Sequence, residues 1–209
     1  MTVSPREALA RLQEGNQRFV SGVRSLDALL THTRRAALAN EQHPFAIVLG
    51  CSDSRVPAEV VFDQGLGDLF VIRVAGNIVA PSQVGSVEFA VARFGTPLVV
   101  VLGHTQCGAI LATLEDVQTG TKASPGVRSI VDRVRPAVET LLAMGVPASS
   151  EELVRQAVRA NVRASANHLR HGSAVLERLI AEGSVVVLGG EYCLDTGKVE
   201  FFDGLSDLG

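Results

Sequence analysis

Phe45-Ala-Ile-Val-Leu-Gly50 is an unbroken apolar run, and Cys51-Ser-Asp-Ser-Arg55 follows it directly. A strand with one face in water alternates apolar and polar residues. An unbroken apolar run is instead typical of a strand covered on both faces, as in a parallel sheet. The same pattern recurs at 69–74, 97–103 and 184–190. These four segments predict the central strands of the fold.

A fifth strand and the intervening helices complete the predicted architecture. The segment 198–202 follows the turn Asp195-Thr-Gly197 and can pair antiparallel with the fourth run as an edge hairpin. We therefore expect an α/β fold with a central, mostly parallel sheet, in which four parallel strands and a C-terminal antiparallel edge strand are flanked by helices. Helical periodicity predicts one helix that begins at Pro5 and others at 26–40, 82–94, 127–144 and 151–169, with a short one ending at 180.

The first helix has a clear start and an apolar stripe. Ser4 before Pro5 has the pattern of an N-cap followed by proline at the first helical position. The stripe consists of Leu9, Leu12 and Phe19. It can cover the sheet of its own chain or pack on a second subunit, and the sequence favours neither. The later helix at 82–94 is expected to carry Val84, Val87, Phe89 and Val91 on its apolar side.

Composition and charge exclude several classes of function. The chain has 209 residues, 46% of them hydrophobic and 20% charged, which fits one ordinary globular domain. We expect a single domain over 1–209, with an N-terminal helical arm at 1–41 and an α/β core at 42–209. A net charge of −3 without a basic cluster argues against nucleic acid as a partner. No apolar run approaches the roughly 18 to 20 residues that a membrane span needs.

The cysteines and the N-terminus predict a cytoplasmic location. Residues 1–16 are polar and lack the apolar core of a secretion signal. Three cysteines give no disulfide framework. Such a count fits a reducing compartment, where thiols are more often metal ligands or nucleophiles.

The chemistry is concentrated where two of the predicted strands end. Cys51 follows the first apolar run, and His104 follows the third, with Cys107 three residues later. Because the carboxyl ends of parallel strands meet at one edge of a sheet, these side chains converge if the two strands are neighbours. Two thiolates and an imidazole suit zinc, and three protein ligands leave a fourth position open for chemistry. The sequence thus predicts one Zn²⁺ per chain, held by Cys51, His104 and Cys107.

Asp53 and Arg55 lie two and four residues beyond the first ligand. Arg55 can hold Asp53 in one rotamer through a bidentate bond and add positive potential beside a metal whose charge the thiolates cancel. Asp53 could then orient the nucleophile, or it could take the fourth zinc position and switch the site off. A third interpretation is an Asp–Arg pair that caps the next helix near Pro57.

These residues belong to motifs that closely resemble those of the β-class carbonic anhydrases. The resemblance covers nearly the whole chain, from Glu14-Gly-Asn-Gln-Arg-Phe19 to Asp195-Thr-Gly-Lys-Val199. The most specific matches are Cys51-Ser-Asp-Ser-Arg-Val56, Asp68-Leu-Phe-Val-Ile-Arg73 with Ala75-Gly-Asn77, and Gly103-His-Thr-Gln-Cys-Gly-Ala109.

The resemblance implies an activity and an assembly. The implied reaction is the reversible hydration of CO₂ to bicarbonate and a proton, by hydroxide generated at the zinc. Asp53 and Arg55 match the family's catalytic dyad. The family's functional unit is a homodimer that often assembles into tetramers, with the N-terminal helices packed on the partner subunit.

The resemblance also implies a substrate pocket built across the dimer interface. Gln42, Phe70 and Gly108 match its glutamine, phenylalanine and glycine. Two positions depart: Ala75 replaces a valine, and Phe89 replaces a tyrosine, so that one hydroxyl is lost. Phe70, Ala75 and Phe89 are expected to form an apolar slot for CO₂, and Gln42 to donate a hydrogen bond to it. Gln42 and the absence of tryptophan from the chain favour the permanently open form over the bicarbonate-regulated one.

Two other functions fit the same ligands. A hydrolase of CS₂ or carbonyl sulfide would use the same metal on another small, linear, uncharged substrate. A non-catalytic protein with structural zinc would need a fourth strong ligand, and Asp53 is the candidate nearby.

Overall fold

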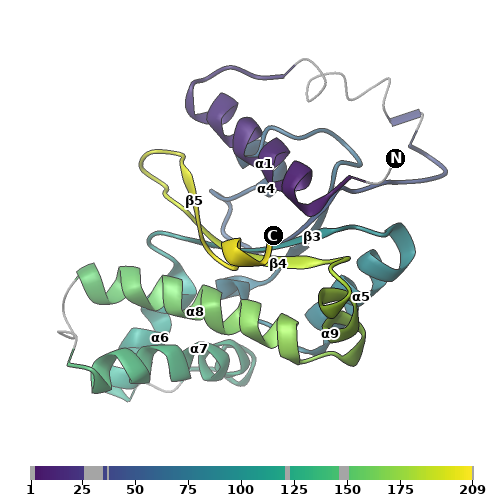
Figure 1. The fold of residues 1–209 in the computed structure, drawn as a ribbon. Coiled ribbons are helices and arrows are strands. Elements are labelled where there is room, and N and C mark those ends of the chain that lie inside the picture. The colour runs from purple at the N-terminus through teal and green to yellow at the C-terminus, as the bar shows by residue number, and fades with distance from the viewer. Residues whose placement is uncertain (1–2, 26–34, 37, 121–122, 146–150, 209) are drawn as a thin grey trace.

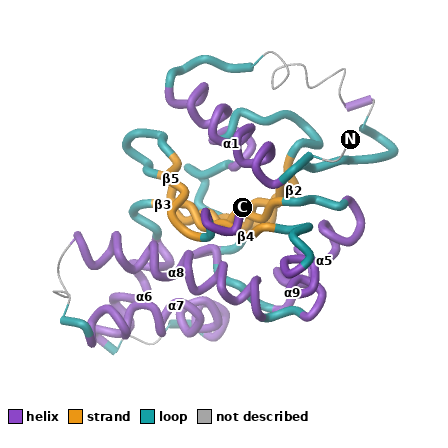
Figure 2. Tube along the Cα trace, in the orientation of Figure 1, coloured by secondary structure: helices purple, strands orange, loops and turns teal. Residues whose placement is uncertain are grey.

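The computed structural model describes residues 3–25, 35–36, 38–120, 123–145 and 151–208. A five-stranded sheet in the order β2-β1-β3-β4-β5 forms its centre (Figure 2). The first four strands pair in parallel, and β4 pairs antiparallel with β5, as predicted. The strands are β1 (Ala46–Gly50), β2 (Leu69–Arg73), β3 (Leu98–His104), β4 (Val186–Tyr192) and β5 (Val199–Asp203).

Helices cover both faces of the sheet (Figure 1). On one face lie α1 (Pro5–Val20) and the short α4 (Ala58–Val61). On the other lie α5 (Pro81–Phe94), α8 (Glu151–His171) and α9 (Ala174–Ala181). The pair α6 (Gly108–Thr119) and α7 (Pro125–Ala143) packs together and against α8. Two 3-10 turns, η1 (Ala75–Asn77) and η2 (Leu205–Leu208), complete the described elements.

The unbroken apolar runs are explained by burial on both faces. Side chains alternate along a strand, so Val48 and Val100 pack towards α1 and α4, whereas Ile47 and Val99 pack towards α5, α8 and α9. Every residue of β1, β3 and β4 is buried. Within the described residues, no helix is long and apolar enough to cross a membrane.

The first helix covers the sheet of its own chain. Ser4 caps it, because its side chain accepts a hydrogen bond from the Glu7 amide, and Pro5 occupies the first turn as predicted. Leu9 and Leu12 are buried with strand residues of the same chain. Of the two interpretations of the stripe, the structure supports the one in which it covers the sheet of its own chain. The second predicted helix, at 26–40, lies mostly outside the described residues.

One predicted apolar position on α5 is wrong. Val87 and Val91 are buried and Val84 packs against the same core, but the Phe89 side chain is 55% exposed. The physical reason is helical geometry, because a residue midway between positions four apart points to the other side of the helix. Phe89 therefore lies at the edge of the core, beside Phe70 and Phe94, with much of its surface in solvent.

The strand order places two strand ends side by side. From β1 the chain passes to β2 on one side, and β3 then joins β1 on the other side. The order of strands thus reverses between β1 and β3, and ligands gather at such a point in open α/β sheets. Helix α8 approaches this edge closely, since a Cβ on Gly103 would lie 2.6 Å from a methyl carbon of Val162. Glycine next to His104 allows that contact.

A buried carboxylate anchors the N-terminal segment to the core. Asp63 follows α4, is 1% exposed, and accepts hydrogen bonds from Arg18 Nε at 2.6 Å and Arg24 Nε at 2.8 Å. The Ser25 amide donates a third at 2.9 Å. Burial alone would raise the pKa of Asp63, but these donors outweigh it and hold the pKa below its usual value.

Asp63→Asn should therefore destabilise the protein by about 2 kcal/mol at pH 7, because the charged acceptor of these hydrogen bonds is lost. Asn tolerates the left-handed backbone there, with φ of 46°, so the substitution adds little strain. The pKa is lowered on folding, so the carboxylate stabilises fully above about pH 5 and less as the pH falls through its folded pKa.

Urea unfolding of both proteins at pH 7 and pH 3 measures this effect. The difference between wild type and variant should shrink at the lower pH. Asp132→Asn is the control, since Asp132 is 56% exposed and its contacts with arginine are 3.8 Å or longer. Equal stability of wild type and Asp63→Asn at pH 7 would contradict the anchoring role.

Candidate metal centre

Three side chains from two neighbouring strand ends converge on one point. Cys51 follows β1, His104 is the last residue of β3, and Cys107 immediately precedes α6. The two sulfurs and one ring nitrogen lie within 4.8 Å of one another, and all three residues are buried. The predicted convergence is confirmed.

His104 is set up to offer its Nε2 lone pair. Its Nδ1 lies 2.8 Å from the Thr105 carbonyl oxygen, which requires Nδ1 to carry the proton. Nε2 is buried and has no hydrogen-bond partner among the described residues. An unpaired polar atom in the interior is unfavourable unless something binds it. Two sulfurs and an aromatic nitrogen at this spacing fit zinc, and three protein ligands leave one position of a tetrahedral ion for a further ligand.

The two thiols lie close together in an apolar environment. Cys51 and Cys107 belong to a small core between α6, α7 and α8 that includes Ile110 and Val134. A hydrogen bond from Cys107, opposed by burial, lowers the pKa of Cys51 to about 4. The same bond, with burial, raises the pKa of Cys107. A metal ion that binds both residues as thiolates displaces the thiol proton of Cys107.

A backbone amide donates to the first ligand. The Gly76 N–H lies 3.3 Å from Cys51 Sγ. Gly76 has φ of 71°, and a Cβ there would lie 2.9 Å from the Cβ of Ala109, so only glycine fits. Gly76 belongs to the motif Ala75-Gly-Asn77, which by itself predicts no role for it. A usable signal was a glycine just past a predicted strand, because glycine in that place marks a turn.

Asp53 and Arg55 form a bidentate pair beside the ligands. Arg55 Nε lies 2.9 Å from Asp53 Oδ1, and Arg55 Nη2 lies 2.7 Å from Oδ2. The guanidinium holds the pKa of Asp53 well below its usual range. Oδ2 lies 3.9 Å from His104 Nε2, so the carboxylate faces the metal position. Helix α4 begins after Pro57 without a side-chain cap among the described residues, which rules out the capping interpretation.

Arg73 holds the turn that carries both a ligand and the acid. From the end of β2, its Nε donates to the Cys51 carbonyl at 3.1 Å and its Nη2 to the Asp53 carbonyl at 2.7 Å. These bonds fix the backbone on both sides of Ser52. The sequence patterns gave Arg73 no role at the site, although an arginine inside the otherwise apolar run 69–74 was a usable signal.

The expected substrate residues are placed in different surroundings. Phe70 is half-buried, and its ring centroid lies 6.3 Å from that of Phe89 and 6.2 Å from that of Phe94. Ala75 is half-buried in η1, beside Gly76. Gly108 begins α6 and is exposed, with open space where a Cβ would be.

Gln42 lies elsewhere in the same chain. It is exposed and lines a cavity of about 930 Å³ together with Leu66, Arg93 and Phe94. The described lining of that cavity contains none of the three metal ligands. A single chain therefore does not bring Gln42 to its own metal centre.

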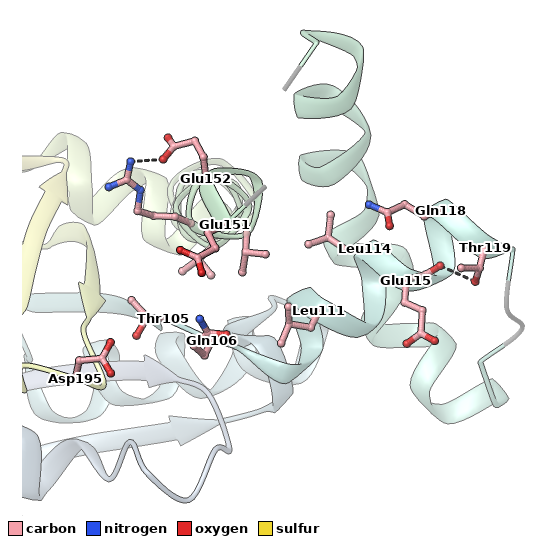
Figure 3. A pocket seen from close by; sticks show the side chains of 13 residues that line it. Thr105, Gln106, Leu111, Leu114, Glu115, Gln118, Thr119, Glu151, Glu152 and Asp195 are labelled. Carbon is pink, nitrogen blue, oxygen red and sulfur yellow. Dashed lines mark hydrogen bonds and ion pairs between the residues drawn. The ribbon is translucent and has the colours of Figure 1, made fainter. Parts of the chain in front are cut away.

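A second cavity, of about 790 Å³, opens behind the turn that joins His104 to Cys107 (Figure 3). Thr105 and Gln106 line it from the turn, and the acidic side chains of Glu115, Glu151 and Asp195 line it from the surrounding elements. Its described lining does not include the ligands or Asp53. The carbonyl of Gln106 lies on the dyad side, 3.5 Å from Arg55 Nη2.

Comparison with known proteins places the chain in a family. Residues 46–199 match the family model described as "Carbonic anhydrase". The chain is 41% identical to carbonic anhydrase 2 of Mycobacterium tuberculosis over 99% of this chain and 97% of that protein. It is 40% identical to a carbonic anhydrase of Mycolicibacterium smegmatis, with the same coverage.

Solved structures show the same fold. The β-carbonic anhydrase CcaA is 27% identical, with a TM-score of 0.75 over 95% of this chain and 89% of that one. The Coccomyxa β-carbonic anhydrase in complex with acetazolamide is 27% identical, with a TM-score of 0.72 over 95% of this chain and 90% of that one.

Removing one sulfur tests the metal centre directly. Cys107→Ser should reduce bound zinc from about one ion per chain to a small fraction, because a neutral hydroxyl replaces a thiolate ligand. Metal analysis after dialysis against a weak chelator measures it. Cys193→Ser is the matched control. The Cys193 thiol lies outside the ligand cluster, so this variant should retain about one zinc ion per chain. Full zinc content in Cys107→Ser would show that the ligand set is wrong.

Proposed function

This chain belongs to the β-class carbonic anhydrases, and from that premise we propose how its residues divide the work of the reaction. The enzyme catalyses the reversible hydration of CO₂ to bicarbonate and a proton, with zinc bound by Cys51, His104 and Cys107. The observation that carries this conclusion is the buried cluster of two sulfurs and one unpaired imidazole nitrogen, with a fixed carboxylate beside it.

Asp53 acts as the hydrogen-bond acceptor that orients the nucleophile. Zinc, when bound, makes water acidic enough to supply hydroxide near neutral pH. Asp53 stays ionised and fixed, because Arg55 engages both of its oxygens. From its place 3.9 Å from His104 Nε2, Oδ2 accepts a hydrogen bond from the nucleophile and directs a lone pair at the carbon of CO₂. Arg73 fixes the position of Asp53 relative to Cys51, because it donates hydrogen bonds to the backbone carbonyls of both residues.

CO₂ binds in an apolar slot to which two subunits contribute. Phe70 and Ala75 supply its apolar wall, next to the turn that carries Gly76, and Gly108 leaves room at the start of α6. Gln42 donates a hydrogen bond to an oxygen of CO₂ as negative charge develops there. Because Gln42 lines a cavity without the ligands of its own chain, the donor at each site comes from the second subunit.

The assembly is a homodimer, which can pair further into a tetramer. The exposed side chain of Phe89 lies beside Phe70 and Phe94, with centroids 6.3 and 5.7 Å away. A cluster of three phenylalanines with one ring in solvent is an apolar patch that a partner would cover. Leu66 is also exposed and lines the Gln42 cavity with Phe94. The apolar patch and the displaced glutamine thus share one face.

The chain is of the plant-like, open branch. Its support is that Asp53 is bound to Arg55 through both oxygens, which keeps the carboxylate from serving as a fourth zinc ligand. The absence of tryptophan removes the side chain that marks the bicarbonate-regulated pocket. A cytoplasmic location suits a site that depends on two free thiolates.

The two alternatives can be separated by experiment. CS₂ and carbonyl sulfide share the size and shape of CO₂, so only direct assays with each substrate distinguish them. The described residues offer three clustered ligand atoms, which argues against a closed structural site. Stopped-flow CO₂ hydration with and without a zinc chelator, at more than one pH, tests the function itself. Loss of hydration on chelation supports it, and zinc-independent or absent hydration overturns it.

The role of Asp53 can be tested without disturbing the metal. Asp53→Ala should keep a full complement of zinc, since Asp53 is not a ligand, and should lower kcat/KM about 10²- to 10⁴-fold. Stopped-flow hydration and metal analysis on the same sample measure both. Asp207→Ala removes an acidic side chain from η2 as a control. Normal turnover of Asp53→Ala would exclude the orienting role.

The dimer face makes a separate prediction. Phe89→Glu places a charge within the apolar patch and should shift the protein from dimer towards monomer, with turnover falling in parallel because Gln42 is withdrawn. Sedimentation velocity and the hydration assay measure the two effects. Met144→Glu is the control, since Met144 is 74% exposed on another helix end. If Phe89→Glu remains a dimer, the interface lies elsewhere. If the wild type is an active monomer, the proposed two-subunit site is excluded.

A further inference from the structure

Asn161 is a polar residue on the buried side of α8. It is 2% exposed and lies among apolar residues that include Val158 and Val162. Its Nδ2 donates a hydrogen bond of 2.7 Å to the carbonyl oxygen of Gly76. Both atoms are buried, so loss of the donor would leave the carbonyl without a partner in the interior.

Gly76 is held from several sides. Its carbonyl is bonded to Asn161 and its N–H to Cys51 Sγ, while its α-carbon packs against Ala109, two residues beyond Cys107. Its φ of 71° is a conformation that the chain does not adopt by default. The direction of the N–H therefore depends on what holds the carbonyl on the other side of the same residue.

An N–H bond to a thiolate has two effects on a metal centre. It fixes the rotamer of the sulfur, and it withdraws part of the negative charge that the sulfur would otherwise donate to the metal. Such outer partners of metal ligands are worth about 10- to 100-fold in metal affinity or activity. Cys51 receives its bond from a backbone amide, so a second residue must position that amide.

We propose that Asn161 is a positioning residue of the zinc centre, which acts by holding Gly76 so that its amide is donated to Cys51. This role presupposes the zinc centre assigned above. Asn161 acts on Cys51 from α8, more than a hundred residues further along the chain. Ser165 lies one turn further on the same helix and is also buried, but no hydrogen bond links it to the ligand turns among the described residues.

Two substitutions separate hydrogen bonding from packing. Asn161→Leu fills nearly the same volume without a donor, and Asn161→Ala removes both volume and donor. Each variant should bind zinc about 10-fold more weakly, measured by competition with a chelator of known affinity. In the cobalt-substituted protein, each should shift the thiolate-to-cobalt charge-transfer band, because the charge on the Cys51 sulfur changes. A purely structural role would leave that band in place.

Further variants keep the test decisive. Ser165→Ala should retain wild-type zinc affinity and the wild-type band. Asn161→Ser keeps a hydroxyl donor on a shorter side chain and should fall between wild type and Asn161→Ala, which provides a milder variant if the larger changes prevent folding. Circular dichroism of the metal-free proteins establishes folding.

Three results would overturn the role. One is wild-type affinity and an unshifted band in folded Asn161→Ala, which has lost the donor. Another is weakening in Asn161→Ala but not in Asn161→Leu, which would assign the effect to packing. The third is equal weakening in Ser165→Ala. Failure of the zinc centre itself would be recognised separately, because Cys107→Ser would then retain its metal.

Discussion

The pairing of β1 with β3 is the constraint on which the site depends. Gly50 is in register with Leu102, so Cys51 and His104 both emerge just past the paired segment, at the point where the strand order reverses. A slip of one residue would turn every side chain of one strand to the opposite face and carry His104 away from the sulfurs. The apolar runs are buried on both faces, and this burial fixes the register of the strands. The same register places the metal ligands, so the packing of the core also determines the geometry of the site.

Around the ligands, one backbone amide and two arginine side chains control charge and position. Two thiolates cancel the charge of a divalent ion, and this limits how strongly the ion can polarise water. The Gly76 amide withdraws charge from one sulfur, and the cationic Arg55 lies beside the carboxylate that faces the metal. Arg73 fixes the two carbonyls that bracket Ser52. Helix α8 packs against Gly103, next to His104, and bonds through Asn161 to Gly76, whose amide donates to Cys51, so one helix contacts the surroundings of both ligands.

Much of this could be predicted from the sequence, and the omissions have a common origin. Apolar runs gave the sheet, because burial on both faces leaves a local pattern. Cys51, His104 and Cys107 were found because they follow predicted strands directly. Arg73, Gly76 and Asn161 were missed as site residues, because their roles arise from contacts between segments far apart in the chain. The exposure of Phe89 and the packing of α1 on its own sheet depend on which surface each helix meets, and periodicity alone does not specify that.

The central claim is that one zinc ion is bound by two sulfurs and one imidazole nitrogen, with one position left for the reaction. Zinc K-edge X-ray absorption on the active wild-type enzyme tests it most directly. The predicted shell has two sulfur neighbours at about 2.3 Å and two lighter nitrogen or oxygen neighbours at about 2.0–2.1 Å. A shell of four sulfurs, a shell without sulfur, or an active preparation that contains no zinc would contradict the account.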